Sequence, residues 1–178
     1  MVTFICILRG INVSGKNKIL MQDLKALFES MSFKNVKTYI QSGNVVFDAK
    51  STKNLETIIQ QKIKEQYGFD VPVIIRTVDE ITSILKQNPY LKQKNIELDK
   101  LHITFLSEQP SKENLTKINT YNFEPDVFEI IGNDVYLHCP NGYGNTKLSN
   151  TFFENKLKVT ATTRNWKTVN EIAKLCNQ

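Results

Sequence analysis

The sequence predicts an α+β protein made of two successive halves, each with the element order βαββαβ, and an extra helix at the C-terminus. Short apolar runs with strand character alternate with segments in which apolar residues recur at helical spacing. Glycine-containing turns at Ser42-Gly43 and Gly132-Asn133 each join two β-rich segments into a hairpin. This order is that of ferredoxin-like domains, so we expect two antiparallel sheets.

The first half begins with a strand that is apolar on both faces, which is typical of a central, covered strand. Gly68 is placed to end the second helix with a positive φ. The predicted elements are strands at residues 2–8, 36–40, 45–47 and 71–75 and helices whose apolar residues span 20–31 and 55–63.

The second half follows a short helix that begins with the capping-box spacing of Thr77 and Glu80 and ends at Asn88-Pro89. Ser111 and Asn165 are predicted helix caps. The predicted elements are strands at residues 101–106, 127–131, 135–139 and 159–163 and helices at 111–118, 147–157 and 165–176. We therefore expect a first half at 1–78, a short helix and linker at 79–99, and a second half with the C-terminal helix at 100–178. No residue-level repeat relates the two halves.

Composition is that of an ordinary globular protein, with 178 residues, 40% hydrophobic and 23% charged. The three cysteines are too far apart to indicate a disulfide framework or a zinc site, and no apolar run approaches a membrane span. We expect a reduced, cytoplasmic protein without a membrane partner. The net charge is +5. Basic residues gather at 1–37 and 147–167, which suggests a partner rich in phosphate or carboxylate, although solvated surface lysines explain the same pattern.

The segment Arg9–Lys18, RGINVSGKNK, lies between the first strand and the first helix. Glycines allow several backbone N–H groups to face one anion, and basic side chains add charge. We predict a phosphate or carboxylate site here, formed by Arg9, Gly10, Asn12, Gly15, Lys16 and Lys18. The alternative is that the glycines and Asn12 only form turns.

The same segment matches the GxxxxGK spacing of a nucleotide-binding P-loop. Asn17 stands where a Ser or Thr should reach magnesium, the helix pattern starts only near Met21, and hairpins predict an antiparallel sheet. A nucleoside triphosphatase is therefore disfavoured.

Three further stretches contain polar residues that suit a binding site. Gln41-Ser42-Gly43-Asn44 is a turn whose position relative to the first loop the sequence does not decide. Residues 141–147 form a glycine-broken loop that ends at Lys147. Arg164-Asn165-Trp166 holds the only tryptophan, which would either stack on a ligand or anchor the core.

The two histidines suggest one more arrangement. If Leu101, Ile103 and Phe105 face the helices, then His102 faces away and shares the opposite sheet face with Tyr136 and His138. A third metal ligand is lacking, so packing explains this arrangement better than metal binding. No Ser/His/Asp or Cys/His pattern indicates nucleophilic catalysis, and the third strand lacks the signature of an RNA recognition motif. No metal and no cofactor is implied.

Four motifs resemble those of the bacterial domain-of-unknown-function family 1697. They are RGINV-x-GKNK from Arg9, TYIQSGNVVF from Thr38, YG-x-x-KL from Tyr143 and ATTRNW-x-TV from Ala161. The resemblance spans nearly the whole chain and implies a cytoplasmic α+β protein of two ferredoxin-like halves with no established activity. Leu20 departs from the family, which often has proline before the first helix. The family's patterned residues fall on Arg9, Asn12, Lys16, Gln41, Ser42, Asn44, Lys147, Arg164, Asn165 and Trp166.

We therefore expect a binding protein for a phosphorylated small molecule or nucleotide, held where the loops at 9–18, 141–147 and 163–166 meet. One alternative is single-stranded RNA binding through a longer basic track. The other is a structural or interaction protein, in which Arg164 and Trp166 are buried and serve packing. The sequence indicates a class of ligand and no reaction.

Overall fold

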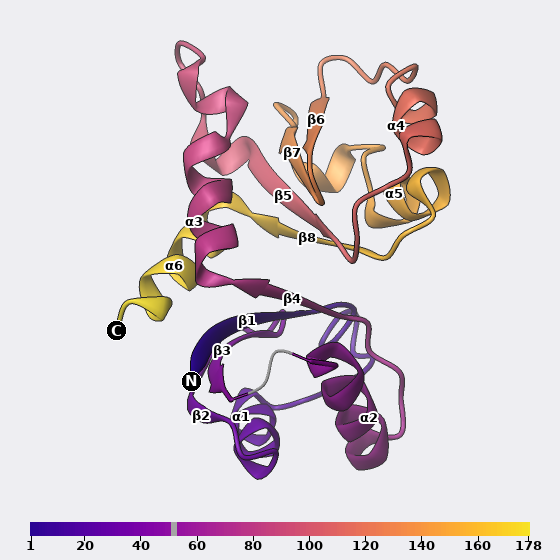
Figure 1. The fold of residues 1–178 in the computed structure, drawn as a ribbon. Coiled ribbons are helices and arrows are strands. Elements are labelled where there is room, and N and C mark those ends of the chain that lie inside the picture. The colour runs from indigo at the N-terminus through magenta and orange to yellow at the C-terminus, as the bar shows by residue number, and fades with distance from the viewer. Residues whose placement is uncertain (51–52) are drawn as a thin grey trace. The chain divides into compact units, whose positions relative to one another are not determined.

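The protein forms two compact units in a computed structural model that describes residues 1–50 and 53–178 (Figure 1). Unit 1 comprises Met1–Thr82 together with Glu171–Gln178, and unit 2 comprises Ser83–Asn170. Both units contain the predicted βαββαβ order, and the predicted α+β class with two antiparallel sheets is confirmed. The domain limits inferred from the sequence stay a prediction.

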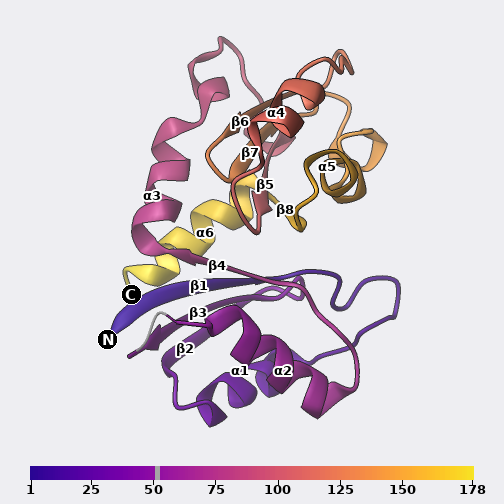
Figure 2. The ribbon, with the colours of Figure 1, turned by 45° about the vertical axis from the view of Figure 1, so that its right-hand side comes forward.

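The sheet of unit 1 has the strand order β2-β3-β1-β4, and all its neighbours are antiparallel. Helices α1 and α2 lie on one face of this sheet (Figures 1 and 2). The elements are β1 Val2–Leu8, α1 Met21–Ser30, β2 Lys34–Tyr39, β3 Asn44–Ala49, α2 Leu55–Tyr67 and β4 Val73–Thr77. This antiparallel pairing excludes the parallel sheet that a P-loop enzyme requires.

Alternate residues of β1 point toward the helices and meet a cluster of aromatic rings. Phe33 and Phe47 have ring centroids 4.5 Å apart, and Phe28 meets Phe47 edge-on at 5.3 Å. The predicted covered strand is confirmed, because β1 is buried on both parities from Phe4 to Leu8. Gly68 ends α2 with φ of 78°, as predicted, and its N–H donates to the Lys64 carbonyl.

Unit 2 repeats this topology with the strand order β6-β7-β5-β8. Ser111 caps α4 as predicted, and Thr77 and Glu80 form the predicted reciprocal capping box at the start of α3. The elements are α3 Val78–Gln87, β5 Leu101–Leu106, α4 Lys112–Ile118, β6 Val127–Ile131, β7 Asp134–His138, α5 Asn150–Leu157, β8 Ala161–Asn165 and α6 Trp166–Cys176. The unit boundaries fall within α3 and α6.

The predicted facing of β5 is wrong. His102 pairs with Leu137 and Thr104 pairs with Val135, and both of these partners belong to the core that α4 and α5 cover. His138 pairs with Leu101 instead, so the two histidines lie on opposite faces of the sheet. Every residue of β5 is buried, and hydrophobicity therefore cannot tell the two faces apart.

Several element boundaries also differ from the sequence prediction. Strand β4, for example, spans Val73–Thr77 and not residues 71–75. Helix α5 begins at Asn150 and not at residue 147, because Ser149 caps it by accepting a hydrogen bond from the Phe152 N–H. Strand β8 continues to Asn165, whose side chain caps α6 by accepting from the Thr168 N–H. The predicted helix and linker at 79–99 contains a buried residue, Tyr90, whose ring lies 6.0 Å from that of His138.

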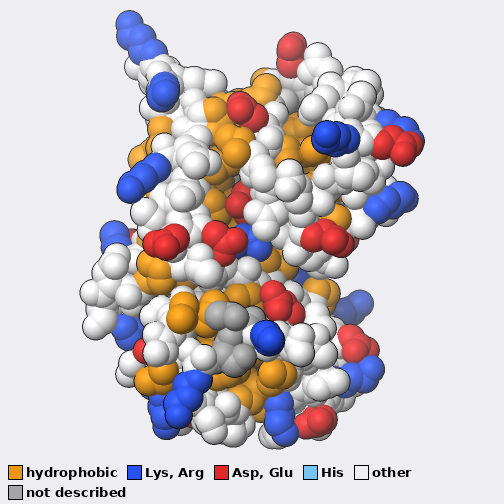
Figure 3. Space-filling model, viewed as in Figure 1, with side chains coloured by type: hydrophobic (Ala, Val, Ile, Leu, Met, Phe, Trp, Pro, Cys, Tyr) orange, Lys and Arg blue, Asp and Glu red, His pale blue; other side chains and the backbone are white. Residues whose placement is uncertain are grey.

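Acidic and basic side chains are interspersed on the face drawn in Figure 3. No helix within residues 1–50 and 53–178 is long and apolar enough to span a bilayer.

Candidate functional sites in the two units

The opening loop, residues 9–18, is folded tightly on itself between β1 and α1. The Arg9 N–H donates to the Pro72 carbonyl at 3.0 Å, the Asn12 N–H donates to the Asn17 carbonyl, and the Asn17 amide donates to the Gly10 carbonyl. Four of its residues besides Gly10 have positive φ: Asn12, Ser14, Gly15 and Asn17. These local bonds hold the loop in one conformation, and α1 begins only at Met21, as the sequence predicts.

Asn12 joins the opening loop to the hairpin turn at residues 40–43. Its amide nitrogen donates to the Gln41 carbonyl and to the Ile19 carbonyl, both at 2.9 Å, and its oxygen accepts from the Ile19 N–H. Gly43 lies against Leu8 and Ile11, where an added Cβ would come within 2.9 Å of both side chains. The first two sequence motifs therefore lie together at the same end of the sheet of unit 1.

The side chains of this cluster divide into exposed cations and internal structural groups. Lys16 and Lys18 are exposed, and their amines make no ion pair or hydrogen bond with any residue in the described ranges. Arg9 is half-buried. Asn44 is fully buried, and its amide donates to the Tyr39 carbonyl and to the Ser42 hydroxyl. Asn44 and Ser42 thus shape the turn, whereas the two lysines are available to a ligand.

The polar loop, residues 141–147, follows β7 in unit 2. The Asn145 amide donates to the Asn141 carbonyl at 2.9 Å, and Gly142 has φ of 88°. Tyr143 anchors the loop, because its ring stacks on that of His102 at 4.8 Å and its hydroxyl donates to Thr163. The loop therefore has a fixed base, and Lys147 at its end is exposed.

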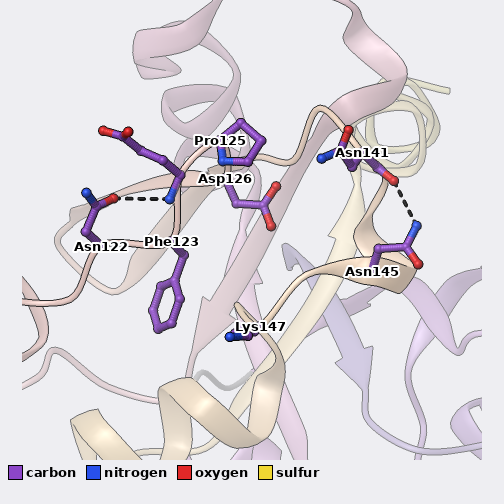
Figure 4. Close-up of a pocket in the computed structure, with 8 residues that line it drawn as sticks. Asn122, Phe123, Pro125, Asp126, Asn141, Asn145 and Lys147 are labelled. Carbon is purple, nitrogen blue, oxygen red and sulfur yellow. Dashed lines mark hydrogen bonds between the residues drawn. The ribbon is translucent and has the colours of Figure 1, made fainter.

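A depression of about 500 Å³ lies between the polar loop and the segment that leads into β6. Its lining includes Asn122, Phe123, Asp126, Asn141, Asn145 and Lys147. Figure 4 shows the side chains of Asp126 and Lys147 pointing into the space between the two segments. The Lys147 amine makes no ion pair or hydrogen bond within the described part of the chain. The Asp126 Oδ1 atom is buried and accepts no hydrogen bond from the described residues.

The last motif, at the junction of β8 and α6, is internal. Arg164 is 8% exposed, and its Nη1 donates to the Thr163 carbonyl at 2.9 Å and to the Thr162 hydroxyl at 3.1 Å. Trp166 is 6% exposed. Asn165 caps α6. Burial of Arg164 and Trp166 is what the packing alternative predicts for these two residues, and a buried indole offers no free face for stacking on a ligand.

The histidines do not form a metal site. His102 and His138 lie on opposite sheet faces, and the described residues contain no group of three His, Cys, Asp or Glu side chains able to hold a metal ion. Burial lowers the pKa of His102, so this imidazole is kept neutral in the core. Around it, Thr163 is hydrogen-bonded to Thr104 and donates to Asn150. This polar cluster serves the packing of α5 on the sheet.

The comparisons with known proteins are consistent with this architecture. The model of a family described as a protein of unknown function, DUF1697, matches residues 1–136. The chain belongs to this family. The conserved bacterial protein SP0830 from Streptococcus pneumoniae has a similar structure, with a TM-score of 0.74, 20% sequence identity and coverage of 98% of each chain. At this identity the likeness establishes the fold alone. No curated protein matches the chain.

The DUF1697 match contains the opening loop, the hairpin turn and Asp126, whereas Lys147, Arg164 and Trp166 lie beyond residue 136. The predicted site residues thus belong to both units, with Arg9, Gly10, Asn12, Gly15, Lys16, Lys18, Gln41, Ser42 and Asn44 in unit 1 and Lys147, Arg164, Asn165 and Trp166 in unit 2. One common site for all of them stays a prediction.

Sequence reasoning missed the segment at residues 122–126, which supplies five of the eight residues that line the depression. The sequence of this segment does not indicate a binding site, because Asn122, Pro125 and Asp126 are ordinary turn residues ahead of a strand. Only the fold brings Asp126 next to the polar loop that the sequence did single out.

Proposed function

We propose that this DUF1697 protein binds a small phosphorylated molecule, the class that includes nucleotides, in the depression of unit 2. One observation carries the proposal: the amine of Lys147 points into a concave space and is not neutralised by any described residue. Small-molecule sites are concave, and a lysine ammonium is a common point contact for phosphate.

The size and the lining of the depression support the same class of ligand. Its volume of about 500 Å³ lies within the usual range for small-molecule sites, roughly 300–1,000 Å³. Amide groups of Asn141 and Asn145 stand opposite the Asn122 to Asp126 segment (Figure 4). Neutral amides can donate to phosphate oxygens without adding charge.

We test this proposal with phosphorylated metabolite analogues, using calorimetry and thermal unfolding of wild type and Lys147→Ala. A hydrogen bond between charged groups contributes about 1.5–3 kcal/mol, so the variant should bind roughly 10- to 100-fold more weakly. Ligand at about 100 times its dissociation constant should stabilise wild type by about 2.7 kcal/mol. Lys112→Ala, an exposed lysine at the start of α4, is the matched control and should bind like wild type.

Two results would contradict the proposal. The first is the absence of any binding by phosphorylated compounds at millimolar concentration. The second is equal affinity in wild type and Lys147→Ala, which would show that the phosphate is held elsewhere.

A second candidate function is the binding of single-stranded RNA at the opening loop of unit 1. Lys16 and Lys18 are exposed on a loop that is held in one conformation, and their amines are unpaired within the described residues. An exposed pair of cations suits an extended polyanion better than a small molecule, which needs a concave site. The phosphate or carboxylate site that the sequence predicts at residues 9–18 is thus proposed here as a site for the phosphates of RNA.

Salt dependence tests the second candidate. The affinity of single strands falls with salt with a slope of about 0.7 per phosphate contacted, so removing both lysines should reduce the slope by about 1.4. The measurement is the affinity of an oligouridylate for wild type and Lys16→Ala/Lys18→Ala across a salt series. The double variant Lys92→Ala/Lys94→Ala, at exposed lysines of unit 2, controls for the loss of net charge. An unchanged slope in the first variant would rule out the opening loop.

We also propose that the protein works in the reducing cytoplasm. The thiols of Cys139 and Cys176 are free, and burial raises the pKa of Cys139 to about 11, so this thiol is protonated and unreactive at neutral pH. Fractionation of cells that express the protein would test this location.

A further inference from the structure

We infer that the depression of unit 2 selects phosphorylated ligands that also carry hydroxyl groups, with Asp126 as the residue that recognises those hydroxyls. The expected ligand class is therefore the sugar phosphates. The inference rests on the proposed function, because it names which phosphorylated molecules the Lys147 site accepts.

Asp126 is held in place by its own backbone. Its N–H donates to the Phe123 carbonyl at 3.0 Å, and the two residues form a short antiparallel bridge across Glu124 and Pro125. This turn fixes the carboxylate at the edge of the depression, directed into the space that faces the polar loop (Figure 4). The position of the acceptor is thus set before any ligand arrives.

One oxygen of the Asp126 carboxylate lacks a hydrogen-bond donor among the described residues. Its Oδ1 atom is buried and receives no hydrogen bond from the described residues. Buried polar atoms are almost always hydrogen-bonded, and an ionised carboxylate can only accept. A donor on the ligand is therefore the group that best complements this atom.

Hydroxyl groups satisfy this requirement better than a metal ion does. The described residues contain no group of three acidic, histidine or cysteine ligands, and the cationic Lys147 lines the same depression. A bare cation would be repelled by that amine. A sugar hydroxyl donates to the carboxylate and can at the same time accept from an amide such as that of Asn141.

The aromatic residue of the depression, Phe123, is held in place by two neighbouring rings. The Phe123 ring stacks with Tyr121 at 6.0 Å, with an angle of 10° between the planes, and meets the edge of Phe152 at 5.1 Å. These contacts engage the ring within the unit. The ring therefore forms an apolar wall of the depression.

The test compares four probes that separate the phosphate from the hydroxyls: ribose 5-phosphate, propyl phosphate, free ribose and inorganic phosphate. Affinities are measured by calorimetry for wild type, Asp126→Asn and Lys147→Ala. Glu108→Gln is the matched control, because it removes one negative charge at an exposed side chain of unit 2 that does not line the depression. Thermal unfolding of each variant establishes that it is folded.

Wild type should bind ribose 5-phosphate about tenfold or more tightly than propyl phosphate, the effect of one charge-assisted hydrogen bond. Asp126→Asn should reduce this preference to about twofold, whereas Glu108→Gln should keep it. Lys147→Ala should weaken both phosphate esters and keep the preference between them.

The outcomes distinguish the inference from the proposal on which it rests. Equal binding of the two esters by wild type, or an equal loss of preference in Asp126→Asn and Glu108→Gln, overturns hydroxyl recognition and leaves phosphate binding intact. Binding of free ribose with the same affinity as its phosphate overturns phosphate binding and retains the role of Asp126. Binding of no probe at all overturns both.

Discussion

At the residue scale, His102 shows how the core sets the chemistry of a polar side chain. This residue is 9% exposed, its ring is stacked on that of Tyr143, and burial lowers the pKa of the imidazole. A histidine with a lowered pKa in the folded state binds its proton more readily in the unfolded state. Folding is then favoured above the unfolded pKa of about 6.5 and loses stability as the pH falls through that value.

We predict that the free energy of unfolding of wild type decreases between about pH 7.5 and about pH 5.5, and that His102→Gln reduces this decrease. Denaturant titrations at the two pH values provide the measurement. Asp48, whose pKa is lowered by hydrogen bonds from Thr3 and Asn35, titrates at more acidic pH and does not interfere. The same pH dependence in both proteins would refute a role for His102.

Arg164 and Trp166 illustrate what residue identity alone leaves open. An arginine next to a tryptophan suits both ligand stacking and core packing, and only burial separates the two roles. The side chains of both residues are almost wholly buried. Lys147, in contrast, ends a polar loop that the sequence predicts to suit a binding site, and its side chain lines a depression.

At the element scale, the opening loop and the hairpin turn behave as one piece of structure. Gly43 has φ of 80°, and a Cβ there would lie 2.6 Å from the Ile11 Cδ1 atom and 2.9 Å from the Leu8 Cβ atom. The glycine therefore serves two purposes, the turn conformation and the close packing of two loops.

We predict that Gly43→Ala destabilises the protein by about 2–5 kcal/mol, the sum of about 1–2 kcal/mol for a left-handed backbone and about 1–3 kcal/mol for overpacking. Gly132→Ala is the control, because Gly132 also has positive φ but has open space around it, and it should cost only the first contribution. Chemical denaturation of both variants measures the difference. Equal destabilisation by the two substitutions would mean that a methyl group at residue 43 is accommodated between the two loops without a packing penalty.

Element order and type were predictable from apolar periodicity, turns and caps, whereas facing and some boundaries were not. The capping signals at Thr77, Ser111 and Asn165 all correspond to observed caps. The facing of β5 was wrong because both of its faces are buried. The contact between Asn12 and Gln41 spans 29 residues and depends on the strand order, which no local signal contains.

At the scale of the whole molecule, the two units share topology and one local feature that the sequence did not reveal as a repeat. Arg76 pairs with Ile5 on the central strand of unit 1, and Arg164 pairs with Ile103 on that of unit 2. Each arginine is buried and donates to the carbonyl of the residue before it. Each is followed by one residue and then a helix. The similarity lies in position and role, and too few residues share it to be visible in the sequence.

Unit 1 is built from two separate segments of the chain, and this bears on the order in which its residues are synthesised. Its segment Glu171–Gln178 leaves the ribosome after all of unit 2, which is continuous in the chain. The Lys37 amine donates to the Leu175 carbonyl across 138 residues, and this bond forms only after all of unit 2 has been synthesised. Unit 2, although second along the chain, is the first to have all its residues available. Unit 1 therefore completes its contacts with Glu171–Gln178 only after every residue of unit 2 has been synthesised.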